Sequence, residues 1–180
     1  MQEYYTLEVA GLKRELPVCP VNEKLYIAGF VMFSDVELTE ACATELIKKV
    51  PEHDVIVTAE SKGIPLAYEM AKQLNEKYFV ARKSFKLYMK DPICVNVKSI
   101  STAAEQKLFL DKNEADFIKG KRVLIVDDVI STGESLKAIE YLVKEAGGNI
   151  VAEAAVLAEG DAAKRDDIVF LSELPLFFKD

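Results

Sequence analysis

Residues 123–135 combine two adjacent carboxylates with a turn rich in hydroxyl groups, which suits them to binding a sugar phosphate. The apolar run 123–126 leads directly into Asp127 and Asp128. Neighbouring carboxylates can accept hydrogen bonds from the vicinal hydroxyls of a ribose, and their charge can stabilise a positive charge that develops on the sugar. We therefore predict that Asp127 and Asp128 are the catalytic acids of a site that acts on a ribose.

The residues that follow form a turn that can bind a phosphate monoester through its backbone. A helical pattern begins after this turn and stops at Gly147. Free amides and the positive end of the helix dipole meet at the start of a helix, and hydroxyl side chains add donors. A simple helix cap and a solvated acidic strand end would explain the two features separately. Their direct succession favours a phosphate site made by Ser131, Thr132, Gly133, Glu134 and Ser135.

Two further loops follow predicted strands and carry positive charge. The first lies between a strand at 54–59 and a helix at 64–74, and the second follows a strand at 78–81. An isolated run of cations is usually a solvated surface. Parallel strands end at one edge of a sheet, however, so both loops are expected beside the acids. We predict that they bind a diphosphate through Ser61, Lys62, Gly63, Arg82, Lys83 and Lys86.

The order of the apolar runs predicts an α/β protein with a doubly wound, mostly parallel sheet. A helix is expected at 35–49, with Asp35 as its cap, and strands and helices then alternate as far as residue 146. Later strands are expected at 150–157 and 168–171, and two more between the basic run and the acids, at 94–100 and 106–110. Three short N-terminal segments predict a small antiparallel flap, namely 4–9, 16–21 and 25–30.

The composition favours a compact protein of the cytoplasm. The 180 residues carry a net charge of −7, which does not favour nucleic acid as a partner. No apolar stretch approaches the length of a membrane span, and the first residues lack the basic start and apolar run of an export signal. Three cysteines, Cys19, Cys42 and Cys94, are too widely separated to indicate a disulfide framework or a zinc site.

Three of these segments resemble motifs of the type I phosphoribosyltransferases. Residues 123–135 resemble the signature with which that family binds phosphoribosyl pyrophosphate (PRPP), although Glu134 stands where many purine enzymes carry a second glycine. The segment 60–63 resembles the pyrophosphate loop of adenine phosphoribosyltransferases, which usually have arginine at the position of Lys62. The Arg-Lys-x-x-Lys segment at 82–86 resembles the one that purine enzymes use on the diphosphate.

The resemblance implies the fold and the organisation of that family. A small N-terminal β hood is expected at residues 1–34, together with part of 171–180. The transferase core is expected at 35–170, with a flexible active-site loop around 88–108. These parts are expected to pack as one structural domain.

The resemblance also implies an enzyme of purine salvage, a pentosyltransferase that moves the phosphoribosyl group of PRPP to a purine base. The products are the nucleoside 5′-monophosphate and diphosphate, adenine is the favoured base, and the protein is expected to be a homodimer. Mg²⁺ is the expected cofactor, held mainly by the substrate with no direct protein ligand. The walls of the base slot are expected to include Phe30, Val31 and Val129.

Several alternatives remain open. A hypoxanthine/guanine or xanthine phosphoribosyltransferase would have a similar layout. A regulator that senses PRPP without chemistry is also compatible, because residues 99–102 replace the Glu-Tyr pair that adenine enzymes commonly carry, and the proton acceptor is left unassigned. The N-terminal residues show no helix-turn-helix pattern, which favours the enzyme. The chain contains no G-x-x-x-x-G-K-[ST] loop, which disfavours a nucleoside triphosphatase.

Overall fold

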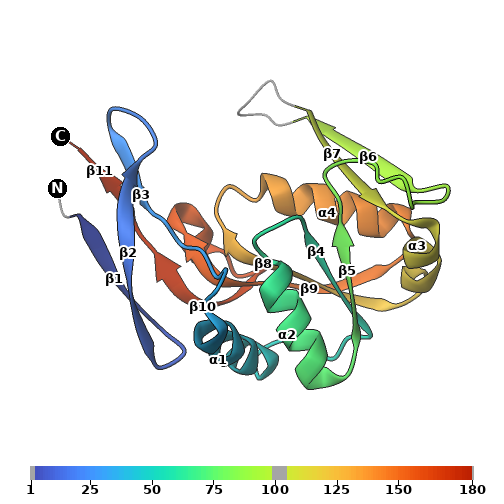
Figure 1. Cartoon of the computed structure of the whole chain (residues 1–180), viewed down its shortest axis with the longest axis horizontal. Helices are drawn as coiled ribbons and strands as arrows, with labels where there is room; N and C mark the ends of the chain where they lie inside the picture. The colour runs from blue at the N-terminus through green and yellow to red at the C-terminus, as the bar shows by residue number, and fades with distance from the viewer. Residues whose placement is uncertain (1–2, 99–104, 180) are drawn as a thin grey trace.

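The computed structural model describes residues 3–98 and 105–179, and a five-stranded parallel sheet forms its centre (Figure 1). The strand order is β10-β9-β8-β4-β5, and every neighbouring pair is parallel. The strands are β4 (Val55–Ala59), β5 (Lys77–Ala81), β8 (Arg122–Ile130), β9 (Asn149–Glu159) and β10 (Val169–Leu174).

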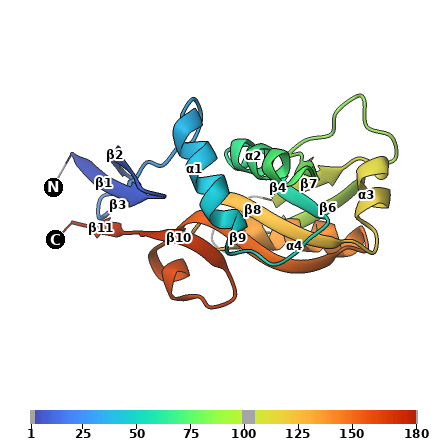
Figure 2. The same ribbon diagram turned by 90° about the horizontal axis from the view of Figure 1, so that it is seen from below.

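Helices cover both faces of this sheet, which confirms the predicted doubly wound fold (Figure 2). The three helices are α1 (Val36–Ile47), α2 (Ile64–Leu74) and, on the opposite face, α4 (Glu134–Glu145). Leu124 and Val126 of β8 pack in the core under helices α1 and α2. Val123 and Ile125 pack in the core on the opposite face, under helix α4. All four side chains are fully buried, so both faces of the strand require apolar residues and the run is unbroken.

A second, antiparallel sheet lies at the β10 end of the molecule and forms the hood (Figure 1). Its order is β1-β2-β3-β11, with strands β1 (Tyr4–Val9), β2 (Leu12–Pro20), β3 (Leu25–Ala28) and β11 (Leu176–Phe178). Of the C-terminal tail, Leu176–Phe178 pairs with β3 in the hood sheet. Residues 171–174 belong to β10 of the parallel sheet, where Leu174 is buried and pairs with Glu159 of β9. The domain boundary at residue 34 stays a prediction.

A hairpin of β6 (Ile93–Lys98) and β7 (Glu105–Leu110) lies at the end of the molecule opposite the hood (Figure 1). Residues 93–98 and 105–108 of the loop expected around 88–108 are therefore paired backbone, and its expected connection at 99–104 lies outside the described residues. A helix that the sequence did not predict follows, α3 (Lys112–Ile118), and a short 3₁₀ helix occupies Gly160–Lys164. Across residues 3–98 and 105–179, no helix is long and apolar enough to cross a membrane.

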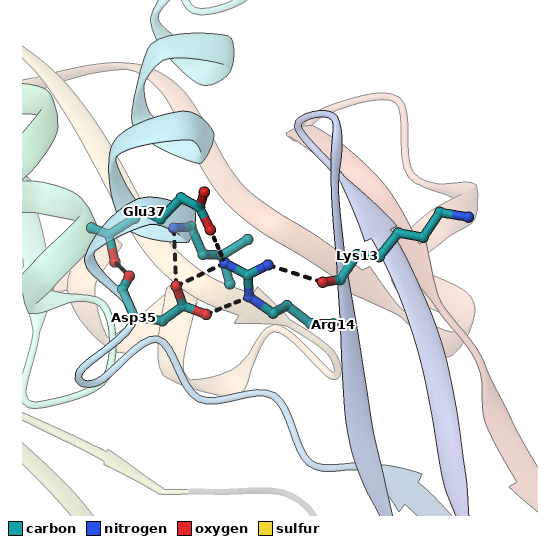
Figure 3. Close-up of polar contacts among 6 residues, drawn as sticks. Lys13, Arg14, Asp35 and Glu37 are labelled. Carbon is teal, nitrogen blue, oxygen red and sulfur yellow. Dashed lines mark hydrogen bonds and ion pairs between the residues drawn. The ribbon is translucent and has the colours of Figure 1, made fainter.

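Charged side chains join the hood to the first helix of the core (Figure 3). Arg14 of β2 donates from Nε to Oδ2 of Asp35 at 2.6 Å and from Nη2 to Oε2 of Glu37 at 2.7 Å. Asp35 also caps α1 by accepting a hydrogen bond from the amide of Leu38, as the sequence predicted. Hydrogen bonding to Arg14 lowers the pKa of the Asp35 carboxyl. Arg14 thus fixes β2 against the start of α1.

Candidate functional site

Asp127 and Asp128 lie where two neighbouring strands of the parallel sheet diverge. Strand β4 pairs with β8 only as far as Val57 and Ile125, whereas β8 continues beside β9 to Ile130. Both acids lie within β8 and not in the turn after it, because pairing with β9 continues past them. The missing neighbour on the β4 side leaves space for a ligand next to both carboxylates.

The two carboxylates are close together and poorly solvated. The amide of Asp128 donates to Oδ1 of Asp127 at 2.8 Å, and Asp128 is only 3% exposed. The ammonium of Lys62 lies 3.5 Å from Oδ2 of Asp128. No described residue donates a hydrogen bond to that oxygen. A buried carboxylate oxygen without a donor is costly, so a hydroxyl group of a ligand would find an acceptor here.

The pKa of Asp127 is raised to about 7 by burial and by the neighbouring Asp128, against the opposing effect of Lys62. Such an acid binds its proton more tightly in the folded than in the unfolded chain. The folded protein therefore loses stability as the pH rises from the ordinary aspartate range, about 4, to about 7. A sugar diol needs the ionised acceptor, so we expect affinity for ribose 5-phosphate to rise about tenfold per pH unit below pH 7.

Calorimetric titration of ribose 5-phosphate across this pH range measures the effect. Asp127→Asn should leave only the part of the pH dependence that comes from the phosphate of the ligand, whose second pKa is about 6. Glu153 provides a control, because burial and the nearby Glu140 also raise its pKa to about 7. The Glu153→Gln variant should keep the pH dependence of the wild type. Loss of the dependence in Glu153→Gln, and not in Asp127→Asn, would contradict the assignment.

The turn after β8 presents backbone amides at the start of α4. Gly133 is the N-cap of this helix and has a φ of 78°, which favours glycine. It has no side chain to cap the helix, so the first amides can donate to an anion. A cavity of about 100 Å³ lies over the turn. All five residues predicted for the phosphate line it: Ser131, Thr132, Gly133, Glu134 and Ser135.

Arg165 lies next to this turn, although nothing in the sequence pointed to it. Its Nη1 is 3.0 Å from the place that a β-carbon on Gly133 would occupy. The guanidinium is held by Asp167 at 2.7 Å and lies 3.8 Å from Glu153. Because Arg165 follows the 3₁₀ helix after β9, only the pairing of β8 with β9 brings it to the turn. Its positive charge favours a phosphate at this position.

The loop after β4 packs directly against the acids. Its Ser61 and Lys62 line a cavity of about 420 Å³ together with Asp127 and Asp128. A β-carbon on Gly63 would lie 2.5 Å from the hydroxyl of Thr58 and 3.1 Å from Oδ1 of Asp127. Residue 63 must therefore be glycine for the loop and the acid strand to approach so closely.

Glu60 connects this loop to the basic segment after β5. Its carboxylate accepts hydrogen bonds from Nε of Arg82 and from the amide of Lys83, both at 2.8 Å. Lys83 lines the main cavity. Arg82 and Lys86 do not line it: Arg82 is bound to Glu60 and to the hydroxyl of Tyr88, and Lys86 donates to Ser84 at 2.9 Å. The assignment of Arg82 and Lys86 to a diphosphate stays a prediction, and it requires these contacts to change.

The hood supplies an apolar wall to the same cavity. Phe30 is buried and Val31 is half exposed, and both line it with Val129 of β8, so the three residues predicted for a base slot lie together. One acid that the sequence did not single out, Glu159, also lines the cavity. The other apolar residues on the hood side are Ile27, Ala28 and Leu174.

Comparison with known proteins agrees with this geometry. Residues 34–177 match the family model described as phosphoribosyl transferase domain. The chain is 37% identical over 131 residues to a hypoxanthine/guanine phosphoribosyltransferase of Methanotorris igneus, covering 71% of this chain and 67% of the relative. It is 34% identical over 151 residues to an adenine phosphoribosyltransferase of Acetivibrio thermocellus, covering 81% and 84%.

A regulator and a solved structure are also similar. The chain is 27% identical over 152 residues to a probable purine biosynthesis transcriptional regulator, PurR, of Streptococcus pneumoniae. This match covers 81% of the chain but 54% of the regulator. The crystal structure of adenine phosphoribosyltransferase from Thermoanaerobacter pseudethanolicus superposes with a TM-score of 0.67 at 19% identity, covering 95% of both chains, which supports the fold.

Proposed function

This chain belongs to the phosphoribosyltransferase domain family, and we propose that it is a purine phosphoribosyltransferase whose preferred base is adenine. It transfers the phosphoribosyl group of PRPP to a ring nitrogen of the base and releases diphosphate. The proposal depends on one observation: a single cavity contains the acid pair, cationic residues of two loops and an apolar wall from the hood.

Positioning supplies most of the expected rate enhancement. The turn at 131–135 would hold the 5′-phosphate, Asp127 and Asp128 the ribose hydroxyls, and the loops after β4 and β5 the diphosphate. Fixing a substrate at three points removes translational and rotational freedom, which can account for roughly 7–11 kcal/mol of a barrier. All three groups of residues lie at the carboxyl edge of the parallel sheet, where ligands of such folds bind.

The chemical step separates charge, and the site stabilises both parts. The nitrogen lone pair of the base forms a bond to C1 of the ribose, while the bond from C1 to the diphosphate oxygen breaks and that oxygen keeps the electron pair. Positive charge that develops on the sugar lies beside Asp127 and Asp128. Lys62 and Lys83 lie beside the departing diphosphate. The nitrogen-bound proton of the base leaves to an acceptor that stays unassigned.

Mg²⁺ is expected to arrive with PRPP, and its ligands would come mainly from substrate oxygens and water. The acid pair fits an ion of this kind, because Oδ2 of Asp128 is buried and receives no hydrogen bond from the described residues. When bound, the metal would neutralise charge on the diphosphate.

The choice of adenine is supported by the 60–63 loop and by the relative from Acetivibrio thermocellus, which the match covers over 84% of its length. The test is to incubate the full chain with Mg²⁺, PRPP and, separately, adenine, hypoxanthine, guanine and xanthine. We expect AMP and diphosphate to form fastest with adenine. Faster turnover of a 6-oxopurine would overturn the adenine assignment but not the enzyme class.

A second candidate is a protein that binds PRPP without chemistry, as the similarity to the Streptococcus pneumoniae regulator suggests. The same experiment separates the two functions. Binding of PRPP, measured by calorimetry, without diphosphate release for any of the four bases would favour the sensor. We also propose a homodimer, which the mass of the protein in solution would test.

The position of the hood should affect the KM for the base more than the KM for PRPP. Arg14→Met removes the guanidinium that binds β2 to the start of α1. Strand β2 pairs with β3, and residues 27–31, at the end of β3 and directly after it, line the cavity, so the substitution should loosen this wall of the cavity. Because the ion pair is partly exposed, we expect the KM for the base to rise by no more than about fivefold, with the KM for PRPP unchanged. Steady-state kinetics with each substrate varied in turn provide the measurement. An equal rise in both KM values would contradict this role of the hood.

A further inference from the structure

The order of the strands sets the order of the chemical groups along the cavity (Figure 1). The basic loops follow β5 and β4, the acid pair lies on β8, and β9 and β10 come next on the side of the hood. A ligand that places its diphosphate near Lys62 and its ribose at Asp128 therefore extends its base toward β9 and the hood. The residue at the end of β9 is Glu159.

Two glutamates line the cavity without a role in the proposed mechanism, Glu60 and Glu159, and Glu60 is already bound by Arg82 and by the amide of Lys83. Glu159 is therefore the candidate for a further role. It pairs with Leu174 of β10, and both residues line the cavity. The next residue, Gly160, packs so closely on Leu176 that an added β-carbon would lie 2.8 Å from the leucine side chain. Glu159 is thus held at a fixed corner between β9 and the hood strand β11.

The carboxylate of Glu159 belongs to a partly exposed residue and is available to a ligand. Throughout the described part of the chain, no residue makes a hydrogen bond or an ion pair with this side chain. The part of the cavity lining that comes from the hood is apolar and includes Ile27, Ala28 and Phe30. The two cations of the cavity, Lys62 and Lys83, follow β4 and β5 on the far side of the acid pair.

We propose that Glu159 is a specificity-determining residue that accepts a hydrogen bond from an exocyclic amino group of the purine. This inference rests on the proposed function and adds which chemical group of the base the site recognises. An ionised carboxylate accepts hydrogen bonds and donates none, so it favours an amino substituent and repels a carbonyl oxygen. Adenine offers its 6-amino group, and guanine offers a 2-amino group. Hypoxanthine and xanthine have no exocyclic amino group.

The test compares bases that differ only in the amino group. Adenine and unsubstituted purine differ at position 6, and guanine and hypoxanthine differ at position 2. For each pair, the ratio of kcat/KM values is measured in the wild type and in Glu159→Ala and Glu159→Gln. Glu173→Gln is the matched control, because Glu173 lies on the neighbouring strand β10, is exposed and does not line the cavity.

We expect the wild type to prefer adenine over purine by at least about tenfold, the size of a hydrogen bond to a charged group. This ratio should fall to near one in Glu159→Ala and should fall less in Glu159→Gln, which keeps an acceptor. The KM for PRPP should not change in either variant. Glu173→Gln should behave like the wild type.

Each other result has a defined meaning. If Glu159→Ala lowers the guanine-to-hypoxanthine ratio of kcat/KM and leaves the adenine-to-purine ratio unchanged, Glu159 keeps its role and the adenine assignment is overturned. Unchanged ratios for both pairs, with normal turnover, would overturn the role of Glu159 and leave the proposed function standing. Absence of turnover by the wild type with every purine would overturn the proposed function, and this inference with it.

Discussion

Asp128→Asn is expected to lower kcat/KM for PRPP by about 10²- to 10³-fold, the usual effect of removing one group that stabilises charge in a transition state. Asparagine keeps the shape of the side chain but removes its negative charge. It also turns an NH₂ group toward ribose hydroxyls that need an acceptor. Steady-state kinetics with saturating base measure the loss.

The same substitution should not unfold the protein. Asp128 is 3% exposed, lies beside Asp127 and has no hydrogen-bond donor to its Oδ2 among the described residues. Removing one of two adjacent buried carboxylates relieves their repulsion, so we expect a higher free energy of unfolding at about pH 8. Asp116→Asn, at an exposed position of α3, is the control and should change neither kcat/KM for PRPP nor the free energy of unfolding. Wild-type kcat/KM in Asp128→Asn would show that this carboxylate does not stabilise the reaction.

Local sequence was enough to predict β8, α4 and the turn between them. An unbroken apolar run fits a strand that is buried on both faces, and a glycine-containing turn before a helical pattern fits the N-terminus of α4. The length of β8 was not predictable in this way. Its end depends on pairing with β9 beyond the last residue of β4, which is a property of the sheet and not of the run itself.

Tertiary contacts also decided which charged residues face the cavity. The run 82–86 gave no reason to separate Lys83 from Arg82, but the carboxylate of Glu60 binds the Arg82 guanidinium and leaves the Lys83 side chain at the cavity. Arg165 and Glu159 were missed for a related reason. Each lies in a segment with no recognisable motif, and each reaches the site because β9 pairs with β8.

Gly63→Ala is expected to lower kcat/KM for PRPP by about 10²-fold, although it adds a single methyl group. The backbone of Gly63 has a φ of −76°, which alanine adopts freely, so the cost comes from contacts alone. The new β-carbon would lie 2.5 Å from Oγ1 of Thr58, which is fully buried, and 3.1 Å from Oδ1 of Asp127. Either the loop or the acid must move, and a displacement of about 1 Å can cost 10²-fold in rate.

Thr58→Ala tests whether this contact is the cause. The hydroxyl of Thr58 is buried and has no hydrogen-bond partner in the described residues, so the single substitution should be tolerated. It also removes the atom nearest to the added methyl group. In the double variant, the loop can return toward its original position against β8, and much of the lost kcat/KM should be recovered. Gly63→Ala alone should lower the free energy of unfolding by about 1–3 kcal/mol, as overpacking does. Equal activity of the single Gly63→Ala variant and the double variant would show that the Thr58 contact does not position the acid and the loop.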